Sequence, residues 1–400
     1  MRAPTPNAFK LALFWLGVQA VWGALLGISL QSRAIELSGG NALVAYGRLA
    51  TIGAIVAAIT QVIVGFWSDA RRARESRRIE FYVAGAIAGA AALMYFYEAR
   101  TMFALTVAFM LLQAALNVAI GPYQAIIPDF VERSRTGAAS SWMAALQSAG
   151  NAVGALAASF IVNLRVLGAS LAALLLVSCA ITVGHARQLP LRTGETDGAS
   201  QLRVTRAFVD LFISRALVYV GFYTLLGYLL FYVTGVLGVA TLPAARLQTG
   251  ILIVTFTLVG ALGAGLAARP SDRLDKRLVA TVGAAGFILA LAVFIGSHAL
   301  AGAIAATVIA GIGWGVFLVA DWAIACRVLP PGAMAAAMGI WNLAVVLPQI
   351  IAPAVTTLVL QGFGRTAGPQ GPQLAFGLAL METLAGITWL WRLPRCVIGE

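Results

Sequence analysis

Charged side chains are scarce in this chain. Aspartate, glutamate, lysine and arginine make up 10% of its 400 residues, whereas hydrophobic residues make up 60%. A water-soluble domain of this length needs far more polar side chains to cover its surface. The scarcity of charge therefore excludes a soluble globular protein and predicts a polytopic membrane protein.

Cysteine and histidine are also rare. Cys179, Cys326 and Cys396 are far apart and have neither the spacing of a metal site nor that of a disulfide framework. His185 and His298 fall outside the predicted membrane core, and the chain has no Walker loop and no nucleophile elbow. We therefore expect no metal, no cofactor and no enzymatic activity.

Long apolar segments recur along the whole chain. We predict twelve, each long enough to cross a bilayer core of about 30 Å. They cover 9–30, 43–66, 81–97, 102–127, 136–162, 166–184, 207–233, 247–268, 278–296, 299–326, 335–360 and 372–391. Segments of this length satisfy their backbone amides in lipid only as helices, so we expect an all-α integral membrane protein.

The basic residues are unevenly distributed. The net charge is +12, and 20 of the 27 lysines and arginines lie in alternate loops or at their edges. By the positive-inside rule, this bias places those loops and both termini in the cytoplasm. We expect a multi-pass protein of the cytoplasmic membrane, without nucleic acid as a partner.

The chain has two similar halves. A polar stretch, residues 185–206, predicts a cytoplasmic linker between an N-terminal bundle at 1–184 and a C-terminal bundle at 207–400. Ser-Asp followed by basic residues occurs after the second helix, at Asp69, and again after the eighth, at Asp272. Such echoes predict a duplicated six-helix unit, as in transporters whose halves rock about a central solute site.

Several motifs resemble a known family. The loop Gly65–Arg78, GFWSDARRARESRR, is similar to the Gly-x-x-x-Asp-Arg-x-x-Arg-Arg loop of the major facilitator superfamily. Within it, Gly121–Asp129, Asp321–Ile324 and Gly339–Gln349 resemble the glycoside–pentoside–hexuronide and sucrose-type symporters. The resemblance implies two pseudo-symmetric six-helix bundles and symport of a sugar or glycoside by alternating access.

The chain departs from that pattern in places. Ala70 stands where an arginine usually follows the aspartate, and the second helix has Arg48, Thr51 and Gln61 but no sodium-binding aspartates. These departures favour a proton over sodium as the coupling ion. The alternatives are a proton-coupled exporter of amphipathic compounds and a non-transporting assembly protein with the same fold.

In the family, charged residues of the cytoplasmic loops lock the helix ends in one state of the cycle. A carboxylate near a helix N-terminus and opposite arginines gains charge-assisted hydrogen bonds, which can bias a two-state equilibrium. The gating residues expected on this basis are Asp69, Arg71, Arg77, Arg78, Asp129, Asp272, Arg273 and Arg277.

Ionisable residues inside the predicted spans are functional candidates because hydrocarbon penalises charge. Arg215 and Asp321 lie at similar depths, so we predict a direct or water-bridged pair that either carries the proton or only joins two helices. Glu382 is either a neutral, hydrogen-bonded acid or a second proton site. Arg48 is expected to snorkel to the surface, and Asp210 to cap the seventh helix.

Uncharged polar and aromatic residues predict a solute site for hydroxyl groups and sugar faces. The candidates are Gln19, Gln113, Asn117, Tyr219, Tyr223, Trp314, Gln147 and Asn151. Their alternative role is interhelical hydrogen bonding. The expected partners are a small-molecule solute, a proton and the lipid bilayer, and we expect a monomer.

Overall fold

The computed structural model describes residues 6–72, 78–124, 126–131, 136–190, 205–328, 334–364 and 370–393. Helices make up almost all of these residues, and none of them forms a strand. The all-α prediction is therefore confirmed.

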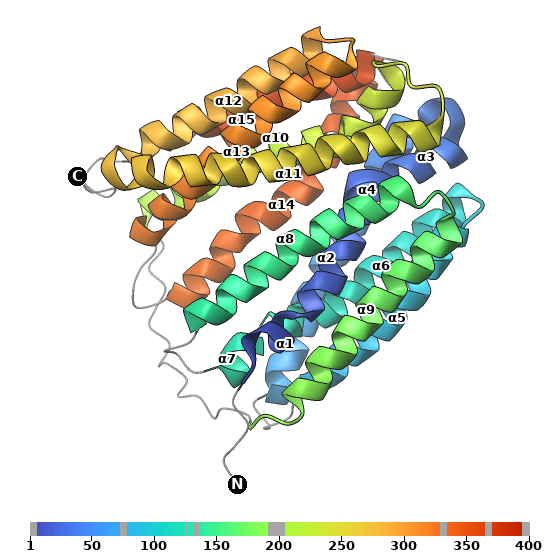
Figure 1. Ribbon diagram of the computed structural model, residues 1–400, viewed down its shortest axis with the longest axis vertical. Coiled ribbons are helices and arrows are strands. Elements are labelled where there is room, and N and C mark those ends of the chain that lie inside the picture. The colour runs from blue at the N-terminus through green and yellow to red at the C-terminus, as the bar shows by residue number, and fades with distance from the viewer. Residues whose placement is uncertain are drawn as a thin grey trace. The chain divides into compact units, whose positions relative to one another are not determined.

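The helices follow one another with short connections (Figure 1). Those of the first half are α1 (Ala8–Ala12), α2 (Phe14–Ala24), a π-helical turn η1 (Leu25–Ser29), α3 (Leu30–Ser38), a 3-10 turn η2 (Gly39–Asn41), α4 (Ala42–Arg72), α5 (Ile79–Glu98), α6 (Met102–Tyr123), α7 (Ile126–Phe130), α8 (Thr136–Phe160) and α9 (Leu164–Ala186). Those of the second half are α10 (Arg206–Gly235), α11 (Leu242–Arg273), α12 (Lys276–Gly296), α13 (Leu300–Val328), α14 (Met334–Gly362) and α15 (Gln370–Leu390).

Eleven helical segments of the described chain are long and apolar enough to cross a membrane. The twelfth predicted span corresponds to α8, which has 25 residues but is not among the eleven. Ser140, Ser141, Gln147, Ser148 and Asn151 make this helix more polar than the others.

Two predicted boundaries were wrong for local reasons. The first span was expected to end at residue 30, but the helix continues to Ser38. It can do so because Arg33 pairs with Glu36 and donates to the carbonyl of Ala99, which satisfies its charge. The fourth span was expected to reach residue 127, but α6 ends at Tyr123, directly after Pro122.

Polar side chains fix where several helices begin. Thr101, Thr205 and Asp275 each precede a helix and accept a hydrogen bond from a backbone N–H of its first turn. Asn163 does the same for two N–H groups of α9. Such caps satisfy donors that have no partner within the helix, so short polar loops suffice between long apolar helices.

The chain divides into two compact units. One comprises Met1–Gly39 with Ile52–Glu195, and the other Gly40–Thr51 with Thr196–Glu400. Most of the predicted linker, 185–206, lies outside the described residues, so its role as a linker stays a prediction.

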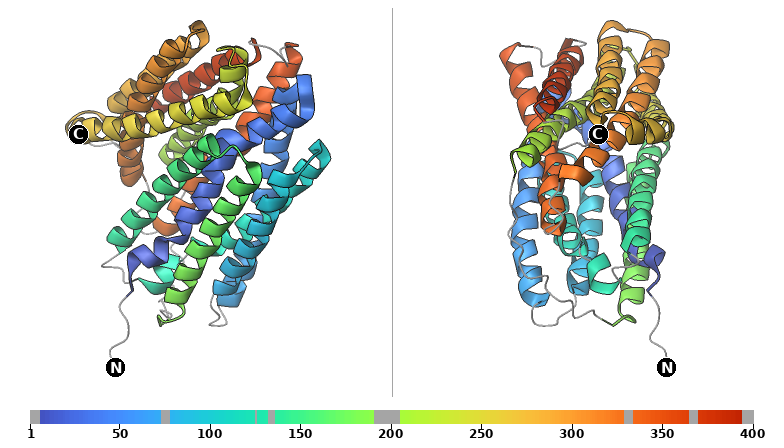
Figure 2. Two further views of the ribbon diagram at one scale, coloured as in Figure 1. Left: turned by 45° about the vertical axis from the view of Figure 1, so that its right-hand side comes forward. Right: turned by 90° about the vertical axis from the view of Figure 1, so that its left-hand side faces the viewer.

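The same helix pairs pack inside each unit. In the first unit α2 packs on α8 and α9, and α5 packs on α6 and α9. In the second unit α10 packs on α14 and α15, and α12 packs on α13 and α15, which are drawn in yellow to red in Figure 2. This repeated pattern is the internal pseudo-symmetry expected from the sequence echoes.

Close backbone contacts explain glycines in equivalent positions of the two units. A Cβ added to Gly85 on α5 would lie 2.6 Å from the carbonyl oxygen of Ala115 on α6. A Cβ added to Gly313 on α13 would lie 2.6 Å from the carbonyl oxygen of Gly283 on α12. Small residues at these crossings let helices approach in a bilayer, where packing rather than the hydrophobic effect holds them together.

Candidate functional site

An arginine and an aspartate form an ion pair in the interior of the second unit. Nη1 of Arg215, on α10, donates to Oδ2 of Asp321, on α13. Their side chains are only 5% and 3% exposed. Removing either charge would leave the other buried without compensation, so the pair holds α10 and α13 together while both groups are ionised.

Three aromatic rings lie around the guanidinium of Arg215. Its Cζ atom is 3.7 Å from the ring centroid of Trp341, 4.9 Å from that of Tyr219 and 5.9 Å from that of Trp322. Nη2 also donates to the Tyr219 hydroxyl at 3.4 Å. The rings stabilise the cation where water is excluded. We call these five residues, Asp321 included, the Arg215 cluster.

Two donors of the Arg215 cluster have no hydrogen-bond partner among the described residues. They are Nε of Arg215 and Nε1 of Trp341. Both residues are buried, with Arg215 5% and Trp341 2% exposed. An unmatched buried donor destabilises a protein by about 1–3 kcal/mol, so such groups are candidates for contact with a ligand.

A second group of aromatic residues continues from Tyr219 along α10 and onto α13. The rings of Phe222 and Trp314 stack with centroids 4.3 Å apart and an interplanar angle of 13°. The centroid of Tyr219 is 5.1 Å from that of Trp314, and the hydroxyl of Tyr223 accepts a 2.9 Å hydrogen bond from Gln349 on α14. We call Phe222, Tyr223 and Trp314 the aromatic wall.

Glu382 lies on α15 and is partly buried. Its Oε2 accepts a 3.3 Å hydrogen bond from Thr224 on α10, whose hydroxyl is 3.4 Å from that of Thr356 on α14. The carboxylate thus takes part in a polar link among three helices of the second unit. This geometry suits an interhelical hydrogen bond; whether Glu382 also carries a proton stays a prediction.

The structure corrects the role expected for Asp210. Thr205 caps α10, whereas Asp210 lies beyond its first turn and is buried. Asp210 accepts a 3.0 Å hydrogen bond from the indole of Trp389 and so joins α10 to α15. Arg48 is exposed.

The polar candidates of the first unit lie on three helices. Gln113 and Asn117 on α6 are each 7% exposed, and Asn117 donates to the backbone carbonyl of Gln113 at 2.9 Å. On α8, Asn151 is exposed and donates in the same way to Gln147 at 3.3 Å. Gln19, on α2, is partly buried. One donor of each asparagine is therefore used within its own helix.

Gln19 lies where α2 and α8 cross closely. A Cβ added to Gly150 on α8 would lie 2.9 Å from the Cβ of Gln19. The predicted packing role of this glycine and the predicted solute role of Gln19 therefore concern the same crossing.

Several gating candidates lie outside the described residues or side chains. These are Asp69, Arg71, Arg77 and Asp272.

Two further gating candidates form an ion pair inside the first unit. Nη1 of Arg78, just before α5, is 3.3 Å from Oδ2 of Asp129 on α7, and both side chains are 10% exposed. Arg273, at the end of α11, is exposed. The Arg78–Asp129 pair joins two segments of the same unit.

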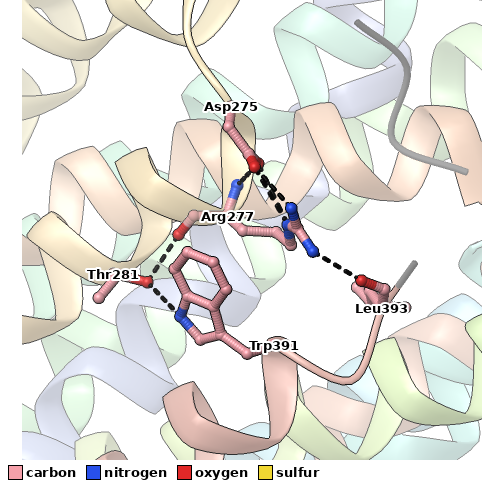
Figure 3. Close-up of polar contacts among 5 residues, drawn as sticks. All are labelled: Asp275, Arg277, Thr281, Trp391 and Leu393. Carbon is pink, nitrogen blue, oxygen red and sulfur yellow. Dashed lines mark hydrogen bonds and ion pairs between the residues drawn. The ribbon is translucent and has the colours of Figure 1, made fainter. Parts of the chain in front are cut away.

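Arg277 is the centre of a polar cluster inside the second unit (Figure 3). Its Nη2 is 2.7 Å from Oδ2 of Asp275, and its Nη1 donates to the carbonyl of Leu393 at 2.8 Å. The Trp391 ring centroid is 5.0 Å from its Cζ, and the Trp391 indole donates to Thr281 at 3.1 Å. Arg277 therefore joins the start of α12 to the segment that follows α15.

Sequence reasoning missed three residues of this site. Trp341 was noted only as an echo of Trp142, and Phe222 and Gln349 were not considered as site residues. A signal for Phe222 exists, because it follows Arg215 and Tyr219 at seven and three residues and so shares their face of α10. The contact of Trp341 with Arg215 depends on the packing of α14 on α10, which spacing cannot reveal.

Comparison with known proteins gives a match over nearly the whole chain. Residues 10–394 match the family described as Major Facilitator Superfamily. No match was found among curated proteins.

Among solved structures, the chain is similar to a bacterial homolog of the human lysosomal transporter Spinster in an inward-facing and occupied conformation. The identity is 16%, the TM-score 0.69, and 96% of this chain and 94% of that chain are covered. The nucleoside transporter NupG is similar with 14% identity, a TM-score of 0.69 and coverage of 96% and 99%. At these identities the likeness shows a common fold alone.

Proposed function

We propose that this chain, which belongs to the Major Facilitator Superfamily, is a proton-coupled symporter of a sugar or glycoside that works by alternating access. Its fold is that of the transporters to which it is similar. The resemblance of its loop motifs to sugar symporters supports the solute class, and the geometry of the second unit supports the proton.

The single observation that carries the coupling proposal is the Arg215–Asp321 pair. The two side chains are almost fully buried on different helices. Protonation of Asp321 would remove the attraction and free one edge of the guanidinium, so the two helices and the cation could respond to a proton. Among the described residues, the ionisable side chains that act on Asp321 are Arg215 and Tyr219, both on α10.

The solute part of the proposal depends on aromatic rings and amides. The aromatic wall offers ring faces on which the C–H faces of a sugar can stack, and Gln349 and Tyr223 place an amide and a hydroxyl beside it. Hydroxyl groups need donors and acceptors together, and amides and hydroxyls provide both. In the first unit, Gln113 and Asn117 stay candidates for the same task.

The gating proposal is narrowed by the observed contacts. Arg78 and Arg277 have their ion-pair partners in their own units, so these pairs stabilise each unit. We keep Asp69 as the candidate for a lock that changes during the cycle, because the positive-inside rule accounts for arginines in that loop but not for an aspartate. Asp69→Asn is expected to slow transport while leaving insertion and solute affinity nearly intact.

Purified full-length protein in liposomes tests the function. Labelled sucrose, maltose and methyl glucoside are offered under an inward proton gradient, with a sodium gradient and a protonophore as controls. Accumulation of one of them that requires the proton gradient supports the proposal. Extrusion of dyes without sugar uptake would instead favour an exporter, and no movement of any solute would favour an assembly protein.

The orientation is proposed from the basic loops. Both termini are expected on the cytoplasmic side of the cell membrane, together with Arg71 and Arg273. Labelling of single cysteines introduced beside these arginines with a membrane-impermeant reagent in intact cells tests it. Labelling without permeabilisation would place these loops outside and contradict the proposal.

A further inference from the structure

The Arg215 cluster has donors that its own residues do not use. Nη1 of Arg215 is engaged by Asp321, and Nη2 has a long contact of 3.4 Å with the Tyr219 hydroxyl. Nε of Arg215 and Nε1 of Trp341 have no partner among the described residues. The free donors therefore belong to one edge of the guanidinium and to the indole that lies over its face.

That edge has a particular chemistry. The Nε–H and one Nη–H of a guanidinium are parallel, and this fork matches the two oxygens of a carboxylate. A hydroxyl group can occupy only part of such a fork. The nearby indole N–H, on a ring whose centroid is 3.7 Å from Cζ of Arg215, adds a third donor and no acceptor. Donors without acceptors select an anionic oxygen group over a neutral polyol.

We propose that the solute carries a carboxylate, which binds the Nε–Nη2 edge of Arg215 and the indole N–H of Trp341, while its ring packs on the aromatic wall. This inference rests on the proposed transport function and names the class of solute. The stacked pair Phe222–Trp314 and the ring of Tyr223 continue from Tyr219, so a carboxylate at Arg215 would place an attached sugar or aromatic ring beside them.

The charges explain why such a solute would be coupled to a proton. Asp321 already neutralises Arg215 in a place that is almost fully buried. A second carboxylate would put two anions on one cation, which low polarity penalises. Protonation of Asp321 removes one negative charge, so an anionic solute and one proton bind together as a neutral set. The anion then takes the place that the Asp321 charge held.

Two matched compounds test the inference on the full-length protein in detergent. Phenyl β-glucuronide and phenyl β-glucoside share the phenyl ring and the sugar, and differ in a carboxylate against a hydroxymethyl group. We expect the glucuronide to bind at least about tenfold more tightly by calorimetry, because hydrogen bonds to charged groups are the strong ones. Thermal unfolding with each compound gives an independent reading.

Trp341→Phe isolates the indole N–H, since phenylalanine keeps an aromatic ring over the guanidinium. We expect it to lower glucuronide affinity by about fivefold or more and to leave glucoside binding unchanged. Trp322→Phe is the matched control, because Trp322 is in the same cluster but 47% exposed. That control should retain the full preference for the glucuronide.

The outcomes separate this inference from the transport proposal. Equal affinity for the two compounds, no binding of either, or equal effects of Trp341→Phe and Trp322→Phe would overturn the carboxylate assignment. Proton-driven uptake of a neutral sugar would keep the transporter and overturn the acidic solute. Preferential glucuronide binding without uptake in liposomes would keep the site and overturn coupled transport.

Discussion

Arg277, in the first turn of α12, donates a hydrogen bond to the backbone carbonyl of Leu393, which follows α15. This contact gives a loop arginine a structural task inside one unit. The sequence pattern assigned Arg277 to a gating loop, and its observed partners, Asp275 and Leu393, lie in the same unit as itself. Contacts of this kind can persist while units move, so they contribute stability.

Arg277→Ala is expected to lower the free energy of unfolding by about 2–4 kcal/mol, because a buried carboxylate partner and a carbonyl lose their donor. Arg277→Lys should fall between the two, since an ammonium cannot reproduce the fork. Thermal or denaturant unfolding in detergent measures both. Arg273→Ala, at an exposed arginine, is the control, and the same loss of stability there would contradict the assignment.

Asp129→Asn is expected to lower the free energy of unfolding by about 3 kcal/mol, because Arg78 would keep a mostly buried charge without its carboxylate. Glu98→Gln is the matched control: Glu98 pairs with Arg165 at 3.4 Å, but the two side chains are 49% and 73% exposed. Exposed pairs are worth about 0–1 kcal/mol, so this control should be nearly neutral. Similar unfolding curves for the two variants would show that burial of the Arg78 pair has little effect.

Asp321→Asn is expected to abolish proton-driven accumulation in liposomes and to preserve solute exchange, because exchange needs no net proton movement. Glu382→Gln serves as the control, since the Thr224 hydroxyl can still hydrogen-bond a neutral amide there. We expect this control to keep accumulation. Accumulation by Asp321→Asn at the wild-type level would show that the pair with Arg215 only joins two helices.

Gly313→Ala is expected to destabilise the second unit by about 1–3 kcal/mol, since the new Cβ meets the backbone of α12 and cannot be accommodated by a side-chain rotation. Gly265→Ala, on α11, is the control because a Cβ there meets nothing within 4 Å. Alanine should stabilise that helix by up to about 1 kcal/mol. Equal effects on the melting temperature would contradict the packing argument.

Tyr223→Phe and Gln349→Leu remove the two partners of one hydrogen bond between α10 and α14. In a double-mutant cycle of unfolding free energies, we expect a coupling of about 1 kcal/mol, as for a buried neutral hydrogen bond. Additive effects of the two substitutions would show that this bond does not contribute to the contact between the helices.

Helix identity and approximate extent were predictable, because long apolar segments have one solution in lipid. Errors arose where a local contact overrides composition. Arg33 was expected to end the first span, yet its charge is satisfied by Glu36 and the Ala99 carbonyl. Asp210 looked like a cap by position, yet Thr205 provides the cap and Asp210 receives the Trp389 indole from another helix.

The sequence by itself determined that this chain is a helical membrane protein with two related halves, since apolar length, basic loops and repeated motifs are properties of the chain order. It also singled out Arg215 and Asp321, because charge in an apolar span is conspicuous wherever the helix packs. Only the tertiary structure decided that Trp341 covers Arg215, that Gln349 reaches Tyr223, and that Arg277 holds Leu393. These contacts join residues tens to more than a hundred positions apart, and their formation depends on which helix faces meet.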